Sequence, residues 1–149
     1  MRCDLERQLQ RDFPFMKPKA ARRNDYDIYG CECRNGWYSI IYDMCREIAK
    51  KYAEDNTVPD IFPDRIGEKY GELCVCFYYD ISSDSNFKLK KLHDDIYSII
   101  NKYENKSIKV CEYCGKSGKL REDLNWIKTL CGKCYVKELR TSEMKGYSK

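Results

Sequence analysis

Two Cys-x-x-Cys pairs near the end of the chain constrain its structure more than any other feature of the sequence. Cys111 and Cys114 form the first pair, Cys131 and Cys134 form the second, and sixteen residues separate the pairs. A Cys-x-x-Cys turn places two thiolates along one edge of the tetrahedron that zinc prefers, and this spacing is in the range of paired zinc knuckles. We therefore expect these four cysteines to bind one structural Zn²⁺ ion that organises the last third of the chain.

Two other interpretations of these cysteines exist: a chance set of buried thiols, or a redox pair. A redox Cys-x-x-Cys begins a helix in a thioredoxin-like setting, and the residues around neither pair indicate one. Gly115 directly follows the first pair and Gly132 lies within the second, so the backbone can bend and point its amides at the sulfurs. The pattern therefore favours zinc.

The segment between and after the pairs predicts the shape of the zinc module. A knuckle, a short hairpin between Leu120 and Ile127, and a helix that starts at the second pair resemble a treble clef more than a flat zinc ribbon. HNH-type nucleases share this layout, but they need a histidine to activate water and further ligands for a catalytic metal. The chain has one histidine, His93, outside this segment and expected on the polar side of a helix. The same absence argues against zinc deaminase chemistry.

A second and weaker cysteine pattern consists of two Cys-x-Cys pairs. On a strand, alternate residues project to one face, so two such pairs could meet around a second metal ion. The alternative is that they are small buried apolar residues, as free cysteine often is. The four residues are Cys31, Cys33, Cys74 and Cys76.

The ten cysteines of the chain also bear on its compartment. The first residues contain no apolar run of the kind that forms a signal peptide, and no segment is long and apolar enough to span a bilayer. We therefore expect a protein of the reducing cytoplasm, where thiols stay free or bind metal and stable disulfides are rare.

Hydrophobic periodicity predicts the core. Seven apolar residues between positions 37 and 52 recur at three- and four-residue steps, which predicts an amphipathic helix. Residues 65–69 and 73–79 predict two strands joined by a turn. A second amphipathic helix is expected over residues 89–103.

These elements predict an α+β fold, with two amphipathic helices packed on a β-hairpin and a C-terminal treble-clef-like, four-cysteine zinc module docked on them. We expect three regions. Residues 1–30 form an N-terminal helix and a basic linker, residues 31–106 form the α+β core, and residues 107–149 form the zinc module with its C-terminal helix.

The formal net charge of +4 is unevenly distributed. Residues 105–149 contain eleven Lys/Arg and five Asp/Glu, a net of +6, so the other 104 residues contain seventeen and nineteen, a net of −2. Four thiolates around one zinc ion would lower the C-terminal value by about two. This segment is mildly basic, which permits phosphate contacts without requiring them.

Two segments are candidate contact surfaces. One is a basic run for which we expect a solvated loop, with a phosphate-contacting arm as the alternative; it contains Lys17, Lys19, Arg22 and Arg23. The other is the zinc-module hairpin, which carries Trp126 and Lys128. Trp126 can stack on a base, anchor a protein partner or pack the module onto the core, and we favour the packing role.

Four stretches of this sequence form an ordered set of motifs. They are residues 33–38 (CRNGWY), 66–73 (IGEKYGEL), 111–116 (CEYCGK) and 126–131 (WIKTLC). In this order they resemble the C-G-D-G-W-(Y/F), V-K-E-K-F-G-G-L, C-E-x-C-G-K and W-I-K-T-L-C motifs of a family of small, uncharacterised proteins common in phage and prophage genomes. The resemblance covers most of the chain and implies a phage or mobile-element setting inside a bacterial host cell. It implies no activity.

The leading functional expectation is a non-enzymatic zinc-binding accessory protein that binds a host or phage protein complex, for instance as an inhibitor of a nucleic-acid-targeting defence complex. The alternative is direct nucleic-acid binding through the basic segments, which salt-dependent retention on nucleic acid would reveal. An enzyme is the third reading. It would need carboxylates such as Asp80, Asp94 or Asp95, and no spacing distinguishes these from a solvated helix face.

Overall fold

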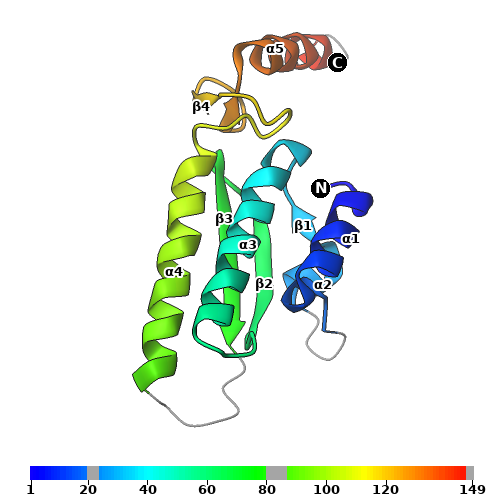
Figure 1. Ribbon diagram of the computed structural model, residues 1–149. Coiled ribbons are helices and arrows are strands. Elements are labelled where there is room, and N and C mark those ends of the chain that lie inside the picture. Colours follow the sequence, from blue (N-terminus) through cyan, green and yellow to red (C-terminus); the bar gives the residue numbers. More distant parts are fainter. Residues whose placement is uncertain (20–23, 80–86, 147–149) are drawn as a thin grey trace.

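The computed structural model describes residues 1–19, 24–79 and 87–146, and its described part is a mixture of helices and small sheets, compatible with the α+β class. Figure 1 shows the long helices α3 and α4 side by side over the main sheet, with the small sheet and α5 at one end. In chain order, the elements are α1 (Cys3–Asp12), η1 (Pro14–Met16), α2 (Asp25–Tyr29), β1 (Cys31–Glu32), η2 (Asn35–Trp37), α3 (Tyr38–Glu54), β2 (Ile61–Lys69), β3 (Glu72–Tyr79), α4 (Phe87–Ser107), β4 (Lys119–Arg121), β5 (Lys128–Leu130) and α5 (Gly132–Gly146).

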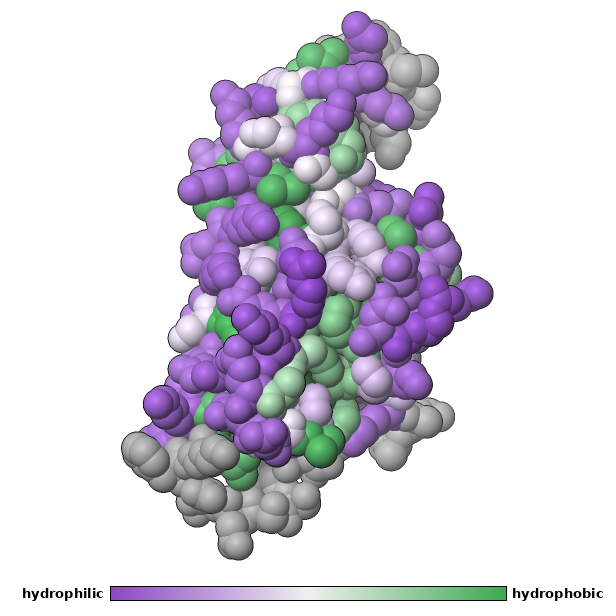
Figure 2. Space-filling view, in the orientation of Figure 1, coloured by the Kyte–Doolittle hydropathy of each residue, from purple (hydrophilic) through white to green (hydrophobic). Residues whose placement is uncertain are grey.

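Helix α3 is the centre of the core and confirms the periodicity of this segment. Six of its residues are buried, at the three- and four-residue steps that place side chains on one helix face: Ile40, Ile41, Met44, Cys45, Ile48 and Tyr52. The apolar stripe of α4 packs against the same cluster. Hydrophilic residues cover most of the face seen in Figure 2, and the less polar ones form a central strip and scattered small patches. Both helices therefore turn their apolar sides inward.

The main sheet has the strand order β1-β2-β3. Strands β2 and β3 form the predicted antiparallel hairpin, whose turn places Tyr70 at φ 53° and Gly71 at φ 78°. Two consecutive left-handed residues form the type I′ turn that matches the twist of the flanking strands. Strand β1, which pairs parallel to β2, was not expected from the sequence.

The sheet register corrects the prediction of a second metal site. Cys31 pairs with Ile66, which in turn pairs with Val75, so these three buried side chains lie on the core face. Cys74 and Cys76 flank Val75 along β3 and therefore point to the opposite face. The sheet therefore separates Cys31 from Cys74 and Cys76. Among the described residues, no metal-binding group contains these three cysteines or Cys33.

The N-terminal segment is part of the core. We expected residues 1–30 to form an N-terminal helix and a basic linker, but this segment also forms η1 and α2 and buries apolar side chains in the central cluster. Helix α2 begins at a side-chain cap, in which Asn24 Oδ1 accepts a hydrogen bond from the Asp27 amide at 2.8 Å. The buried residues of this segment are Leu9, Phe13, Phe15, Met16 and Tyr26.

His93 also differs from its expected place on the polar side of its helix. It is half-buried, with Nε2 at 3.1 Å from Asp60 Oδ2 and its ring stacked on Tyr79 at 3.6 Å between centroids. Tyr52 donates a hydrogen bond to the other Asp60 oxygen at 2.5 Å. These four side chains link α3, α4 and the sheet.

Across the described chain, none of the helices has the length and apolar character needed to cross a membrane.

Candidate metal centre

The first cysteine pair lies on a tight knuckle that follows α4. The Cys111 amide donates to Lys116 O at 2.7 Å, and the Gly115 amide donates to Cys111 O at 2.9 Å. Gly115 has φ 74°, in the left-handed region that glycine adopts without strain. The glycine that directly follows the pair therefore lets the turn close on itself and bring Cys114 back towards Cys111.

The second pair lies where β5 leads into α5. Cys131 precedes the helix, and Cys134 lies in its first turn. The Cys134 amide points at Cys131 Sγ at 3.5 Å, and the Tyr135 amide donates to Cys131 O at 2.9 Å. The first turn of α5 therefore supplies the Cys134 sulfur as a potential metal ligand and the Cys134 amide as a hydrogen-bond donor to Cys131 Sγ.

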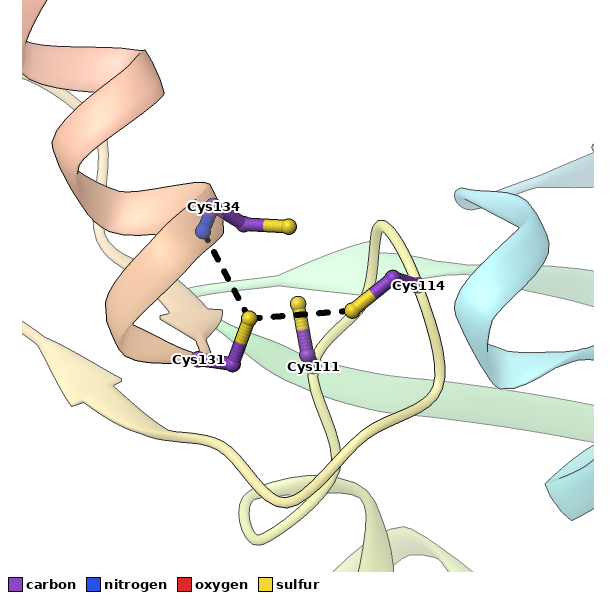
Figure 3. A group of neighbouring side chains, drawn as sticks. All are labelled: Cys111, Cys114, Cys131 and Cys134. Carbon is purple, nitrogen blue, oxygen red and sulfur yellow. Dashed lines mark hydrogen bonds between the residues drawn. The ribbon is translucent and has the colours of Figure 1, made fainter.

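The two pairs converge on one point, as Figure 3 shows. Their four sulfur atoms lie within 4.8 Å of one another, and Cys114 Sγ is 3.6 Å from Cys131 Sγ. A tetrahedral zinc with Zn–S bonds of about 2.3 Å separates its sulfurs by about 3.8 Å, so the arrangement fits such an ion. The four cysteines can hold a metal ion such as zinc. Within residues 1–19, 24–79 and 87–146, no other group of three or more potential ligands is gathered in this way.

The protonation of these thiols depends on their different surroundings. A hydrogen bond from the Cys134 amide is the largest cause that lowers the pKa of Cys131, to about 7. Burial raises the pKa of Cys111, while backbone amides of Cys131, Cys114 and Tyr113 act in the opposite direction. Burial, followed by hydrogen bonds with the neighbouring thiols, raises the pKa of Cys134. Metal binding by such a set releases protons, because the ligand form is the thiolate.

The knuckle is fixed to the core by close backbone contact with η2. The Gly36 amide donates to Glu112 O at 2.8 Å, and Trp37 Nε1 donates to Val110 O at 2.8 Å. A Cβ at Gly36 would lie 2.2 Å from Cys111 O. Trp37 is fully buried. The glycine and the tryptophan of the 33–38 stretch therefore dock the metal-binding turn.

The β4–β5 hairpin makes a second contact with the core, at the turn between β2 and β3. Buried Thr129 donates its hydroxyl to Gly71 O at 2.6 Å. Trp126 Nε1 donates to Glu68 Oε2 at 2.8 Å, and the other oxygen of Glu68 accepts from the Gly71 amide at 2.6 Å. Trp126 is thus tied to the core by one hydrogen bond of its indole N–H, while 57% of its surface stays exposed.

Helix α5 is held to the knuckle by a polar cluster. Lys128 Nζ lies 2.5 Å from Glu138 Oε1 and donates to Tyr113 OH at 3.0 Å. Tyr113 OH donates to the second Glu138 oxygen at 2.8 Å, and the Lys128 hydrogen bond is the main cause that lowers the pKa of Glu138. Lys128, which we expected as a contact residue, is therefore occupied within the module.

The structure places the other expected contact residues as follows. Lys17 is exposed, whereas the Lys19 ammonium lies 3.1 Å from the centre of the Phe62 ring. Arg22 and Arg23 lie outside the described residues, as does Asp80 of the enzyme reading. Of the other two carboxylates, Asp95 forms an ion pair with Lys51 at 2.8 Å. Among the described residues, no group of three or more potential ligands contains Asp94 or Asp95.

Sequence reasoning missed Glu112, which lies between the first two cysteines. Its backbone is held on both sides, because its amide donates to Thr129 O at 2.9 Å and its carbonyl accepts from Gly36. Its side chain is only 3% exposed, and burial, helped by the nearby Glu68 carboxylate, raises its pKa to about 7. No local pattern in the sequence signals this, because Glu112 is held by contacts with Gly36 and Thr129, which are distant from it in the chain.

Comparison with known proteins gives no relative: no protein-family model, no curated protein and no solved structure matches this chain. The function has to be argued from the metal centre and the surface that it fixes.

Proposed function

We propose that this chain is a non-enzymatic zinc-binding protein whose treble-clef-like module holds a contact surface for a protein partner. The observation that carries the proposal is Trp126, which is 57% exposed although its indole N–H is anchored to Glu68 at 2.8 Å. A large aromatic side chain that is both exposed and fixed in orientation is the kind of residue that dominates binding energy at protein interfaces.

Two more exposed apolar residues lie at the turn between β2 and β3, to which Trp126 is bonded through Glu68. Tyr70 is 64% exposed and Leu120 is 39% exposed. Gly71, next to Tyr70, lies against Leu120, and Glu68 bonds both the Gly71 amide and Trp126. We refer to Tyr70, Leu120 and Trp126 as the aromatic face. It spans the core and the module, so its shape depends on the docking of the metal-binding segment.

The choice of zinc rests on the ligand set. Four cysteine thiolates in tetrahedral proximity are typical of structural zinc sites, which keep no open position for a substrate. The ion then serves to fold the segment that carries Trp126 and Lys128.

The proposed setting rests on the sequence resemblance to small phage and prophage proteins. It supports an accessory protein that acts on a host or phage protein complex inside a bacterial cell, and an inhibitor of a nucleic-acid-targeting defence complex is one form of that role. The aromatic face favours a partner with an apolar surface. A pocket on that surface would accept the Trp126 side chain.

Direct nucleic-acid binding is the alternative. The basic charge of residues 105–149 and the exposed indole of Trp126 support it. Two of the cations that such binding would use are engaged, since Lys128 pairs with Glu138 and Lys19 lies over Phe62. The protein-partner reading is therefore preferred.

The proposal is tested by native mass spectrometry of the tagged full chain, purified from nuclease-treated bacterial cells. We expect a protein partner at a fixed stoichiometry, lost in Trp126→Ala and retained in Tyr97→Ala, whose similarly exposed ring lies on α4 away from the module. A partner that both variants retain equally would contradict the aromatic face. Salt-dependent retention on nucleic acid without a protein partner would favour the alternative.

A further inference from the structure

A cavity of 420 Å³ opens beside Trp126, between the metal module and the core. Residues from both parts line it, so it exists only when the module is docked. The side chains that matter for its chemistry are Glu32, Arg34, Glu68, Glu112, Trp126 and Lys128.

Glu112 differs from the other buried polar residues near this cavity in its hydrogen bonding. Its side chain is only 3% exposed, and its buried Oε2 atom has no hydrogen-bond partner. Two other buried polar side chains at this junction are satisfied, since Ser107 Oγ accepts from the Leu73 amide and Thr129 donates to Gly71 O. A buried carboxylate oxygen without a hydrogen-bond donor is destabilising. An N–H group of a ligand would satisfy it.

Glu68 and Lys128 are already engaged and do not bond Glu112 Oε2. Glu68 uses both oxygens, one for the Gly71 amide and one for Trp126. Lys128 is held by Tyr113 and Glu138.

The charge and shape of the cavity narrow the class of donor. Glu32, Glu68 and Glu112 line it, against Arg34, Met1, whose terminal ammonium donates to Cys31 O at 2.7 Å, and a Lys128 whose charge Glu138 already balances. The three carboxylates outnumber the two remaining cations, so an added cation is favoured. The exposed indole of Trp126 offers a flat face at the same place. A guanidinium group fits both features, because it is planar, carries five N–H donors, pairs with a carboxylate through two of them and stacks on aromatic rings.

We propose that this cavity binds the guanidinium group of an arginine side chain, which a protein partner inserts between Glu112 and Trp126. The inference rests on the proposed function for the presence of a partner protein. Its chemistry stands on the cavity itself and can be measured without the partner.

The experiment titrates the full-length, zinc-loaded protein at pH 8 with N-acetyl-arginine amide and follows tryptophan fluorescence. Trp37 is fully buried, so the change reports on Trp126, and Trp126→Phe should abolish it. We expect saturation in the millimolar range, as befits a ligand of this size. N-acetyl-citrulline amide, which has the same shape without the charge, should bind at least about tenfold more weakly.

Two variants assign the binding to Glu112. Glu112→Gln should weaken it by about tenfold or more, which is the typical loss of one charge-assisted pair. Glu122→Gln, at an exposed position of the same hairpin, should leave it unchanged. Zinc content and thermal midpoint are measured for each variant, so that a folding defect is recognised.

Equal affinity for citrulline, unchanged binding in Glu112→Gln, or no saturation with arginine amide would overturn the inference. If Arg34 closes onto Glu112 and fills the site from within, Arg34→Gln would create binding that the unmodified chain lacks, which also overturns it. Capture of a protein partner that persists in Glu112→Gln would leave the proposed function standing without the arginine pocket. Arginine binding without capture of any partner protein would support the arginine pocket and contradict the proposed function.

Discussion

At the scale of single residues, the junction between core and module depends on side chains that are small or absent. Gly36 lies against the backbone of the first cysteine pair, where a Cβ would be 2.2 Å from Cys111 O and 2.6 Å from Glu112 O. Both obstacles are backbone atoms, so a neighbouring rotamer change cannot relieve them. The glycine is therefore required by the close approach of the knuckle.

Gly36→Ala should destabilise the zinc-loaded protein by about 1–3 kcal/mol, the usual cost of forcing extra volume into a packed contact. Chemical denaturation followed by circular dichroism measures this loss. Gly132→Ala is the matched control, because nothing lies within 4 Å of a Cβ at that helical position, and we expect it to be neutral or slightly stabilising. Equal stability of both variants would show that the knuckle does not rest on Gly36.

At the scale of elements, α3 and α4 are joined by packing and by several polar links, one of which centres on Glu47. Glu47 of α3 accepts hydrogen bonds from Lys102 Nζ at 2.6 Å and from Tyr103 OH at 2.9 Å, both on α4. The Lys102 hydrogen bond is the largest cause that lowers the pKa of Glu47 below its ordinary value. The ionised carboxylate is therefore the form that stabilises this helix pair.

This link predicts a pH dependence with a definite sign. Because the folded-state pKa of Glu47 is lowered, its contribution is fully present above the unfolded value of 4.5 and is lost as the pH falls through the folded value. Glu47→Gln should cost less than about 1 kcal/mol at pH 7, since the pair is partly exposed. The difference from the unmodified chain should vanish towards pH 3 in parallel denaturation experiments. A difference that grows on acidification would contradict the assignment.

The sequence predicted elements best where the signal is local. The apolar stripe that became α3, the β2–β3 hairpin and the Cys-x-x-Cys turns all depend on residues close together in the chain. Strand β1 escaped prediction, because a two-residue strand is defined only by its pairing with distant Ile66. The separation of Cys31 from Cys74 likewise depends on the sheet register, and the burial of Glu112 depends on docking against Gly36. Neither has a local signature.

At the scale of the whole molecule, the metal module caps one end of the α3–α4 pair (Figure 1). The core of residues 1–106 has its own buried cluster, whereas the buried apolar side chains among the described residues of the module are Cys111 and Leu130. A small segment without a core of its own depends on its metal for stability. Zinc is therefore expected to stabilise the module and, through it, the aromatic face and the cavity.

Removal of zinc with a strong chelator should unfold the module and leave the core folded. In hydrogen exchange, the amides of residues 110–135 should lose protection, while those of α3 keep theirs. Fluorescence should show Trp126 released from Glu68 and Trp37 still largely buried. Loss of protection in α3 at the same chelator concentration would contradict the independence of the core.

The most direct test of the account is the zinc count of the protein, by native mass spectrometry of material purified without added metal. We expect one zinc per chain. Cys131→Ser should lose it, while Cys76→Ser, at an exposed position on the outer face of the sheet, should keep it. A chain without metal, or a Cys131→Ser variant that retains its zinc, would contradict the assignment of Cys111, Cys114, Cys131 and Cys134 as the ligands.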